Sequence, residues 1–277
     1  MENLEKQSIR QERKKKKIAP LRMTYACLVY LFLYLPIAVV VAFSFNTSKL
    51  NVVFEGFTLE WYVKMWSNKA LMDSFVNTLI VAVVSTLLAT VLGTLCAVGL
   101  NRFEFRLKSL ISNTLYIPIV IPELVFAIAV LILFSSINIP MSMFTLIVSH
   151  VTFSMPFVVI TVRSRLAGFD KSVEEAARDL GANELHTFFR VTLPMIAPGV
   201  MSGAMLALTL SLDDVVVSFF TAGPDSQTLP LKILGMVKKG ISPDVNALST
   251  LIILGTVLLL VSTTIIQTKL ERQETAD

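Results

Sequence analysis

The feature that most constrains this chain is a series of apolar stretches, each about 20 residues or more in length and nearly free of charge. A stretch of that length crosses the hydrocarbon core of a bilayer when it folds as an α-helix. Hydrophobic residues make up 54% of the chain and charged residues only 16%, which is more apolar than a typical soluble domain. The alternating polarity of a membrane β-barrel is absent from these stretches, so we predict an all-α membrane protein.

We predict six transmembrane helices within one domain that covers residues 23–270. Short tails, residues 1–22 and 271–277, precede and follow this domain. The basic first tail resembles the start of a signal peptide, but the apolar stretch after it is too long for one, so we expect an uncleaved first helix. The predicted spans are residues 24–43, 75–100, 109–134, 143–162, 195–222 and 247–268.

The positions of the basic residues indicate how these six spans are oriented. If the N-terminus is cytoplasmic, 18 of the 24 Lys and Arg residues fall on cytoplasmic segments. Such a bias is the usual topology signal of membrane proteins, and it predicts a multi-pass chain with both termini in the cytoplasm. The basic residues form no continuous face, so we expect no nucleic-acid partner. The two cysteines lie far apart in apolar stretches, and no Cys/His cluster predicts a metal or another cofactor.

One cytoplasmic segment, residues 164–194, is unusually polar for this chain; we call it the cytoplasmic loop. Ser172 and Glu175 fit a capping box that starts a helix near Val173. Gly181 can end that helix, and Asn183 can cap a second short one. The pattern predicts two short amphipathic helices that either dock into a groove on a partner or lie on the bilayer surface. In the first helix we expect one apolar face, formed by Val173, Ala176, Ala177 and Leu180, and one polar face, formed by Glu174, Arg178 and Asp179.

The same loop resembles the EAA signature of ABC importer permeases. The signature is long and has fixed gaps, although Val191 stands where that family usually has isoleucine. The resemblance implies the type I permease (MetI-like) architecture, in which this loop is the coupling helix that inserts into the ATP-binding subunit. The residues that it assigns to ATPase coupling are Glu175, Ala176, Ala177, Gly181, Leu193 and Pro194.

Other stretches are similar to the permeases of spermidine/putrescine importers: residues 54–66, 149–170, 210–233 and 240–250. This resemblance implies transport of polyamines across the bacterial plasma (inner) membrane. It also implies the partners of such importers: two copies of an ATP-binding subunit, a second homologous permease and an extracytoplasmic substrate-binding protein. The chain contains no G-x-x-x-x-G-K-[ST] phosphate-binding loop, so we expect a non-catalytic subunit, with ATP hydrolysis on a partner chain.

Three acidic residues, Glu123, Asp213 and Asp214, lie within the apolar stretches. Carboxylates in such positions usually face a bundle interior or a wet cavity, so we expect them to line a path for a cationic substrate. Counted as straight helix from the cytoplasmic side, Glu123 lies about 21 Å and Asp213 about 27 Å along its span. Pro118 and Pro122 are expected to break the third span just before Glu123. For the two aspartates, simple solvation at the outer membrane interface is the alternative.

Aromatic residues in the first outer loop extend this hypothesis. Trp61, Tyr62 and Trp66 can contribute cation–π attraction to a polyamine, or they can form an interfacial aromatic belt. The two histidines, His150 and His186, are expected to be ordinary polar residues, because neither belongs to a metal-binding or catalytic motif.

Three other functions remain compatible with these patterns. The chain can be an ABC importer permease for another small solute, such as thiamine, iron or an organophosphonate. It can be a secondary transporter in which the acidic residues form a proton relay. It can also be a membrane anchor that recruits a partner through the helices of the cytoplasmic loop.

Overall fold

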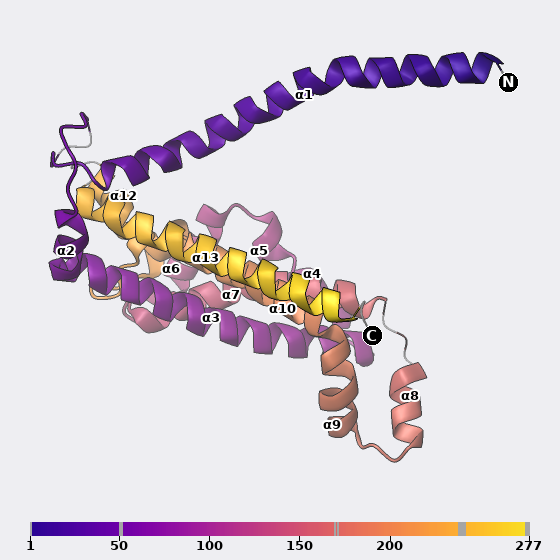
Figure 1. The fold of residues 1–277 in the computed structure, drawn as a ribbon. Coiled ribbons are helices and arrows are strands. Elements are labelled where there is room, and N and C mark those ends of the chain that lie inside the picture. The colour runs from indigo at the N-terminus through magenta and orange to yellow at the C-terminus, as the bar shows by residue number, and fades with distance from the viewer. Residues whose placement is uncertain (1, 50–51, 169, 171, 238–241, 275–277) are drawn as a thin grey trace. The chain divides into compact units, whose positions relative to one another are not determined.

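The computed structural model describes residues 2–49, 52–168, 170, 172–237 and 242–274, and all regular elements among them are helices (Figure 1). The prediction of an all-α fold is therefore confirmed. The chain divides into two compact units: residues 1–68 together with 240–277, and residues 69–239.

The first unit consists of three helices. They are α1 (Glu2–Phe43), α2 (Glu60–Ser67) and α13 (Pro243–Glu274). The apolar part of α1 covers Met23–Phe43. Asn68, which directly follows α2, donates a hydrogen bond of 2.6 Å from Nδ2 to Oδ2 of Asp244, so α2 is joined to the start of α13.

The second unit contains the remaining helices. They are α3 (Lys69–Arg102), α4 (Lys108–Thr114), α5 (Ile117–Val120), α6 (Glu123–Ser136), α7 (Met143–Leu166), α8 (Ser172–Asp179), α9 (Glu184–Thr187), the π-helical turn η1 (Phe188–Thr192), α10 (Leu193–Leu212), α11 (Val216–Thr221) and α12 (Leu229–Val237).

The core of the second unit forms where α3, α7 and α10 pack together. Small residues allow the backbones to approach closely. A methyl group added at Gly93 of α3 would lie 2.8 Å from Cβ of Val158 in α7, and one added at Gly203 of α10 would lie 3.2 Å from Cα of Val158. Because both distances are shorter than ordinary van der Waals contacts, a side chain at Gly93 would force Val158 to move, and one at Gly203 would require a smaller shift of the same residue.

The structure modifies the predicted spans. Among the described residues, four helical segments are long and apolar enough to cross a membrane, and a fifth crossing is counted if α4–α5 and α6 form one broken span. That pair is bent by 114°. The bend follows Pro118 and Pro122, as predicted, but it means that the straight-helix depth of Glu123 does not apply. The sixth predicted span falls in α13, whose apolar stretch within the described side chains, Pro243–Leu258, is shorter.

The predicted fifth span, residues 195–222, is also not one helix. The α-helix α10 ends at Leu212, and α11 begins only at Val216. The break contains both Asp213 and Asp214. Two broken helices, one with its break just before Glu123 and one with its break at the aspartates, therefore shape the candidate site.

Candidate functional site

The three predicted acidic residues lie together, and we call them the acidic cluster: Glu123, Asp213 and Asp214. Glu123 is the first residue of α6, which packs against α11 through Phe126 and Val217. This packing brings the carboxyl group of Glu123 within electrostatic range of both aspartates, which directly precede α11. The two helix breaks thus concentrate negative charge at one place in an otherwise apolar bundle.

The three carboxylates are not equivalent, because Asp214 is committed to partners inside the protein. Only 6% of Asp214 is exposed. Its Oδ1 accepts a hydrogen bond of 3.1 Å from the backbone N–H of Val217, and its Oδ2 accepts bonds of 2.7 Å from both the backbone N–H and the hydroxyl of Ser218. Asp214 therefore satisfies the backbone donors at the start of α11, as a helix-capping residue does.

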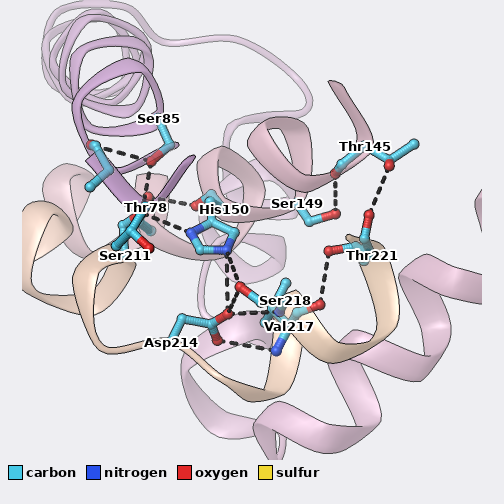
Figure 2. Close-up of polar contacts among 12 residues, drawn as sticks. Thr78, Ser85, Thr145, Ser149, His150, Ser211, Asp214, Val217, Ser218 and Thr221 are labelled. Atoms are coloured by element: carbon cyan, nitrogen blue, oxygen red, sulfur yellow. Dashed lines mark hydrogen bonds and ion pairs between the residues drawn. The ribbon is translucent and has the colours of Figure 1, made fainter. Parts of the chain in front are cut away.

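His150 of α7 completes this arrangement (Figure 2). Its Nε2 lies 3.3 Å from Oδ2 of Asp214 and 3.2 Å from the hydroxyl of Ser218, and its Nδ1 lies 2.8 Å from the hydroxyl of Ser211. Ser211 in turn lies 3.1 Å from the hydroxyl of Ser85 in α3. This polar network, formed by Ser85, His150, Ser211, Asp214 and Ser218, connects α3, α7, α10 and α11.

Sequence reasoning missed this network. It treated His150 as an isolated polar residue, whereas His150 is buried and bonded at both ring nitrogens. The spacing of Asp214 and Ser218, four residues apart, was a local signal for a capped helix start. The contact with His150, 64 residues earlier in the chain, has no local signal.

The other two acidic residues are more open to solvent than Asp214. Asp213 is exposed and Glu123 is half-buried. Of the three predicted acidic residues, these two are therefore accessible to a cation from solvent, while Asp214 bonds to the start of α11 across the break between α10 and α11.

The predicted aromatic residues lie on α2, in the first unit. The N–H of the buried Trp61 ring donates a 2.6 Å hydrogen bond to the carbonyl of Asn46, and Nζ of Lys64 lies 4.7 Å from the ring centroid. The hydroxyl of Tyr62 lies 2.7 Å from that of Ser44. Trp61 and Tyr62 thus hold the preceding loop against α2, whereas Trp66 is exposed.

The cytoplasmic loop forms the predicted first helix, α8, but the predicted second helix does not stop before the next span: α9 continues through η1 into α10. In Figure 1, α8 and α9 extend beyond the ends of α7 and α10, joined by a tight bend. The predicted turn at Gly181 is confirmed: its φ is +87°, and the N–H of Ala182 bonds to the carbonyl of Ala177, as in a Schellman motif. The predicted cap is confirmed as well, since the side chain of Asn183 accepts a 2.8 Å bond from the N–H of His186.

The start of α8 differs from the prediction. The helix begins at Ser172, one residue before the predicted Val173. The carboxylate of Asp170 accepts a 2.9 Å hydrogen bond from the N–H of Ser172. This bond ties Asp170 to the first residue of α8 and is a different contact from the predicted capping box between Ser172 and Glu175.

The apolar sides of this helix pair are turned to solvent. The exposed fraction is 89% for Leu180, 71% for Leu185 and 60% for Phe189. Of the residues that resemble the EAA signature, Glu175 and Ala176 are exposed and Ala177 is half-buried. An exposed apolar surface on helices this short is typical of a docking site for another protein.

A charged residue of the predicted polar face, Glu174, anchors α8 to the bundle. Glu174 is the buried residue of this helix, and it forms an ion pair with Arg102 and accepts a hydrogen bond from Thr192. Burial raises the pKa of Glu174, but the hydrogen bonds from Thr192 and Arg102 outweigh it and hold the pKa below its usual value of 4.5. A depressed pKa means that the ion pair stabilises the fold at neutral pH and is lost only as the pH falls through that lower value.

Replacement of Gly181 by valine tests the bend between α8 and α9. A β-branched side chain in the left-handed conformation costs about 1–2 kcal/mol, although a Cβ atom there meets no neighbour within 4 Å. If the loop couples to an ATP-binding subunit, as its resemblance to the EAA signature implies, we expect the valine variant to lose most solute uptake and Gly181→Asn, which tolerates this conformation, to keep it. Uptake and ATP hydrolysis measured on the same preparations check this. Equal uptake per ATP in the valine variant and the native protein would contradict it.

The sequence of this chain is similar to those of known transport proteins. The family model described as "Binding-protein-dependent transport system inner membrane component" matches residues 89–275. The chain is 41% identical over 257 residues to the spermidine/putrescine transport system permease protein PotC of Escherichia coli K12, covering 93% of this chain and 97% of that protein. It is 38% identical over 242 residues to the putrescine transport system permease protein PotI of the same strain, covering 85% and 86%.

A solved structure shares the fold. It is a bacterial ABC transporter involved in the import of the acidic polysaccharide alginate, with a TM-score of 0.70 and 14% identity over 92% of this chain and 97% of that chain. At this identity the likeness concerns the arrangement of helices alone.

Proposed function

Because this chain belongs to the family of binding-protein-dependent transport system inner membrane components, we propose that it is the permease through which an ATP-driven importer moves polyamines into the cell. The observation that carries this proposal is the 41% identity to a spermidine/putrescine permease over nearly the whole of both chains. The second relative is named for putrescine, which belongs to the same chemical class.

The acidic cluster supports a cationic substrate. A polyamine carries two or more ammonium groups, and each loses hydration when it enters an apolar bundle. Carboxylates along the path compensate for that loss. Glu123 and Asp213 have accessible carboxyl groups, so we assign them to substrate contact and assign Asp214 to holding the site in shape. Trp66, which is exposed, remains a candidate aromatic contact.

The cytoplasmic loop supports coupling to a separate motor. We propose that the exposed faces of α8 and α9 insert into an ATP-binding subunit, with Glu175, Ala176, Ala177 and Gly181 at the contact. Leu193 and Pro194 are the first two residues of α10, so ATP-driven motion of the partner passes directly into this helix and reaches the break that holds the aspartates. In this arrangement the chain itself hydrolyses no ATP.

The rest of the assembly follows from the same proposal. A second, similar permease completes the pathway, two ATP-binding subunits dock on the cytoplasmic side, and an extracytoplasmic binding protein delivers the polyamine. Both termini lie in the cytoplasm, and six helices cross the bacterial inner membrane. Alternation between outward-open and inward-open states exposes the acidic cluster first to one side and then to the other.

Uptake of labelled solutes by cells with and without the gene tests the substrate class. We expect spermidine or putrescine uptake to fall when the gene is deleted, and uptake of thiamine, iron and organophosphonates to stay unchanged. Equal polyamine uptake by both strains would refute the proposal. ATP depletion is expected to abolish uptake, whereas uptake that survives ATP depletion and collapses with a protonophore would instead identify a secondary transporter.

A further inference from the structure

The helix α8 of the cytoplasmic loop carries a buried charge, Glu174. Most of α8 is exposed, yet Glu174 is only 9% exposed. One carboxylate oxygen of Glu174, Oε1, accepts hydrogen bonds from both Arg102 and Thr192. Arg102 also donates a 2.9 Å bond to the hydroxyl of Thr192, so each of the three side chains contacts the other two. We call these three residues the cytoplasmic cluster.

The members of this cluster come from three different elements. Arg102 is the last residue of α3, Glu174 lies in the first turn of α8, and Thr192 is the last residue of η1, directly before α10. The helices α3 and α10 belong to the core of the second unit and carry Ser85 and Ser211 of the polar network. A single carboxylate on α8 therefore contacts the ends of two helices that lead to the substrate path.

The chemistry of the contact makes it directional and stiff. A charge-assisted hydrogen bond is stronger than a neutral one, and it weakens steeply when its geometry is disturbed. Arg102 and Glu174 are largely shielded from water, with side-chain exposures of 17% and 11%, so solvent screens their attraction less than it screens a surface pair. A displacement of α8 thus moves α3 and η1 together or breaks the cluster.

We propose that the cytoplasmic cluster of Arg102, Glu174 and Thr192 transmits the motion of α8 to α3 as well as to α10. Glu174 is then a positioning residue of the coupling machinery, distinct from the exposed residues that contact the ATP-binding subunit. This inference rests on the proposed function, because it assigns a second route for the motion that an ATP-binding partner imposes on α8. The covalent route through α9 and η1 reaches α10, whereas the cluster adds α3.

The test measures how much spermidine uptake accompanies each ATP hydrolysed, rather than uptake or hydrolysis alone. Native protein and variants are assembled with the partner permease and ATP-binding subunits in vesicles, and spermidine uptake and ATP hydrolysis are measured on the same sample. We expect Glu174→Gln and Arg102→Gln each to lower uptake per ATP hydrolysed by about tenfold. Because both remove the same interaction, we expect the double variant to be no worse than either single one. The matched control is Glu104→Gln. It removes the exposed ion pair between Glu104 and Lys108, just after the end of α3, and is expected to leave uptake per ATP hydrolysed unchanged.

Each outcome is decisive for the inference. A Glu174→Gln transporter that keeps the native uptake per ATP, or single effects that add in the double variant, would overturn it. If Glu174→Gln fails to assemble, Thr192→Val decides, since it removes only the hydroxyl group from the cluster: a lower ratio in an assembled transporter supports the inference, and an unchanged ratio overturns it. Native vesicles without ATP-dependent uptake would instead refute the proposed function, so the two failures are distinguishable.

Discussion

Replacement of Asp214 by alanine is expected to prevent most of the protein molecules from folding. The substitution leaves the N–H groups of Val217 and Ser218 without their side-chain acceptor and removes one of the two partners of His150 Nε2, all in a buried setting. Removal of one member of a buried charged or hydrogen-bonded group costs about 3–5 kcal/mol, a large share of the stability of most proteins. The amount of assembled transporter and its thermal unfolding midpoint are the quantities to measure.

The adjacent aspartate is a matched control for this prediction. Asp213 has the same side chain one residue earlier, but it is exposed. Asp213→Ala is therefore expected to leave assembly and the unfolding midpoint near native values. If both variants assembled equally well, the assignment of Asp214 to a supporting role would be wrong.

The double variant Glu123→Gln with Asp213→Asn is expected to assemble normally and to lose polyamine uptake. Both substitutions keep the size of the side chain and remove a negative charge that compensates the ammonium groups of the substrate. If each charge contributes about 1.4 kcal/mol to holding the substrate in the path, the combined loss is about a hundredfold. Initial rates of labelled spermidine uptake over a range of concentrations give this value, with the amount of assembled transporter measured in parallel.

A lower apparent affinity for spermidine in these variants would indicate a lost substrate contact, whereas a general defect of the transporter would lower the maximal uptake rate. We expect each single variant to show an intermediate loss, because the two carboxylates contact the same cation. Native uptake in the double variant would mean that neither residue lies on the substrate path, and that the acidic cluster is merely solvated at the membrane interface.

Local chemistry was sufficient to predict the cytoplasmic loop. Gly181 has a positive φ, and Asn183 caps α9, as expected, because both features depend on residues only a few positions apart. The break before Glu123 was predictable for the same reason, since Pro118 and Pro122 lie within a few residues of it.

The second helix break was missed, although the four-residue spacing of Asp214 and Ser218 was a local signal for it. The residues after Asp214 are strongly apolar, so hydropathy alone extends the predicted span from 195 through 222. The helix ends at Leu212 because Asp214 bonds to Val217 and Ser218 of the next helix and to His150 of a distant one. A long-range contact of this kind leaves no periodic pattern in the sequence.

The burial of Glu174 in the cytoplasmic loop was likewise not predictable from the sequence. Amphipathic periodicity predicts which residues share a face, but it does not say which face contacts the rest of the protein. Here the apolar residues Leu180 and Leu185 are exposed, and the charged residue is buried against Arg102 and Thr192. The usual rule that apolar residues face inward does not hold for these residues, which we propose contact a partner protein.

The most direct test of the account is spermidine uptake into vesicles that contain the purified permeases and ATP-binding subunits, with the binding protein on the opposite side of the membrane. With ATP on the side of the ATP-binding subunits, we predict that labelled spermidine accumulates beyond its external concentration and that a protonophore leaves this accumulation unchanged. Accumulation without ATP, driven by a proton gradient, would contradict the account.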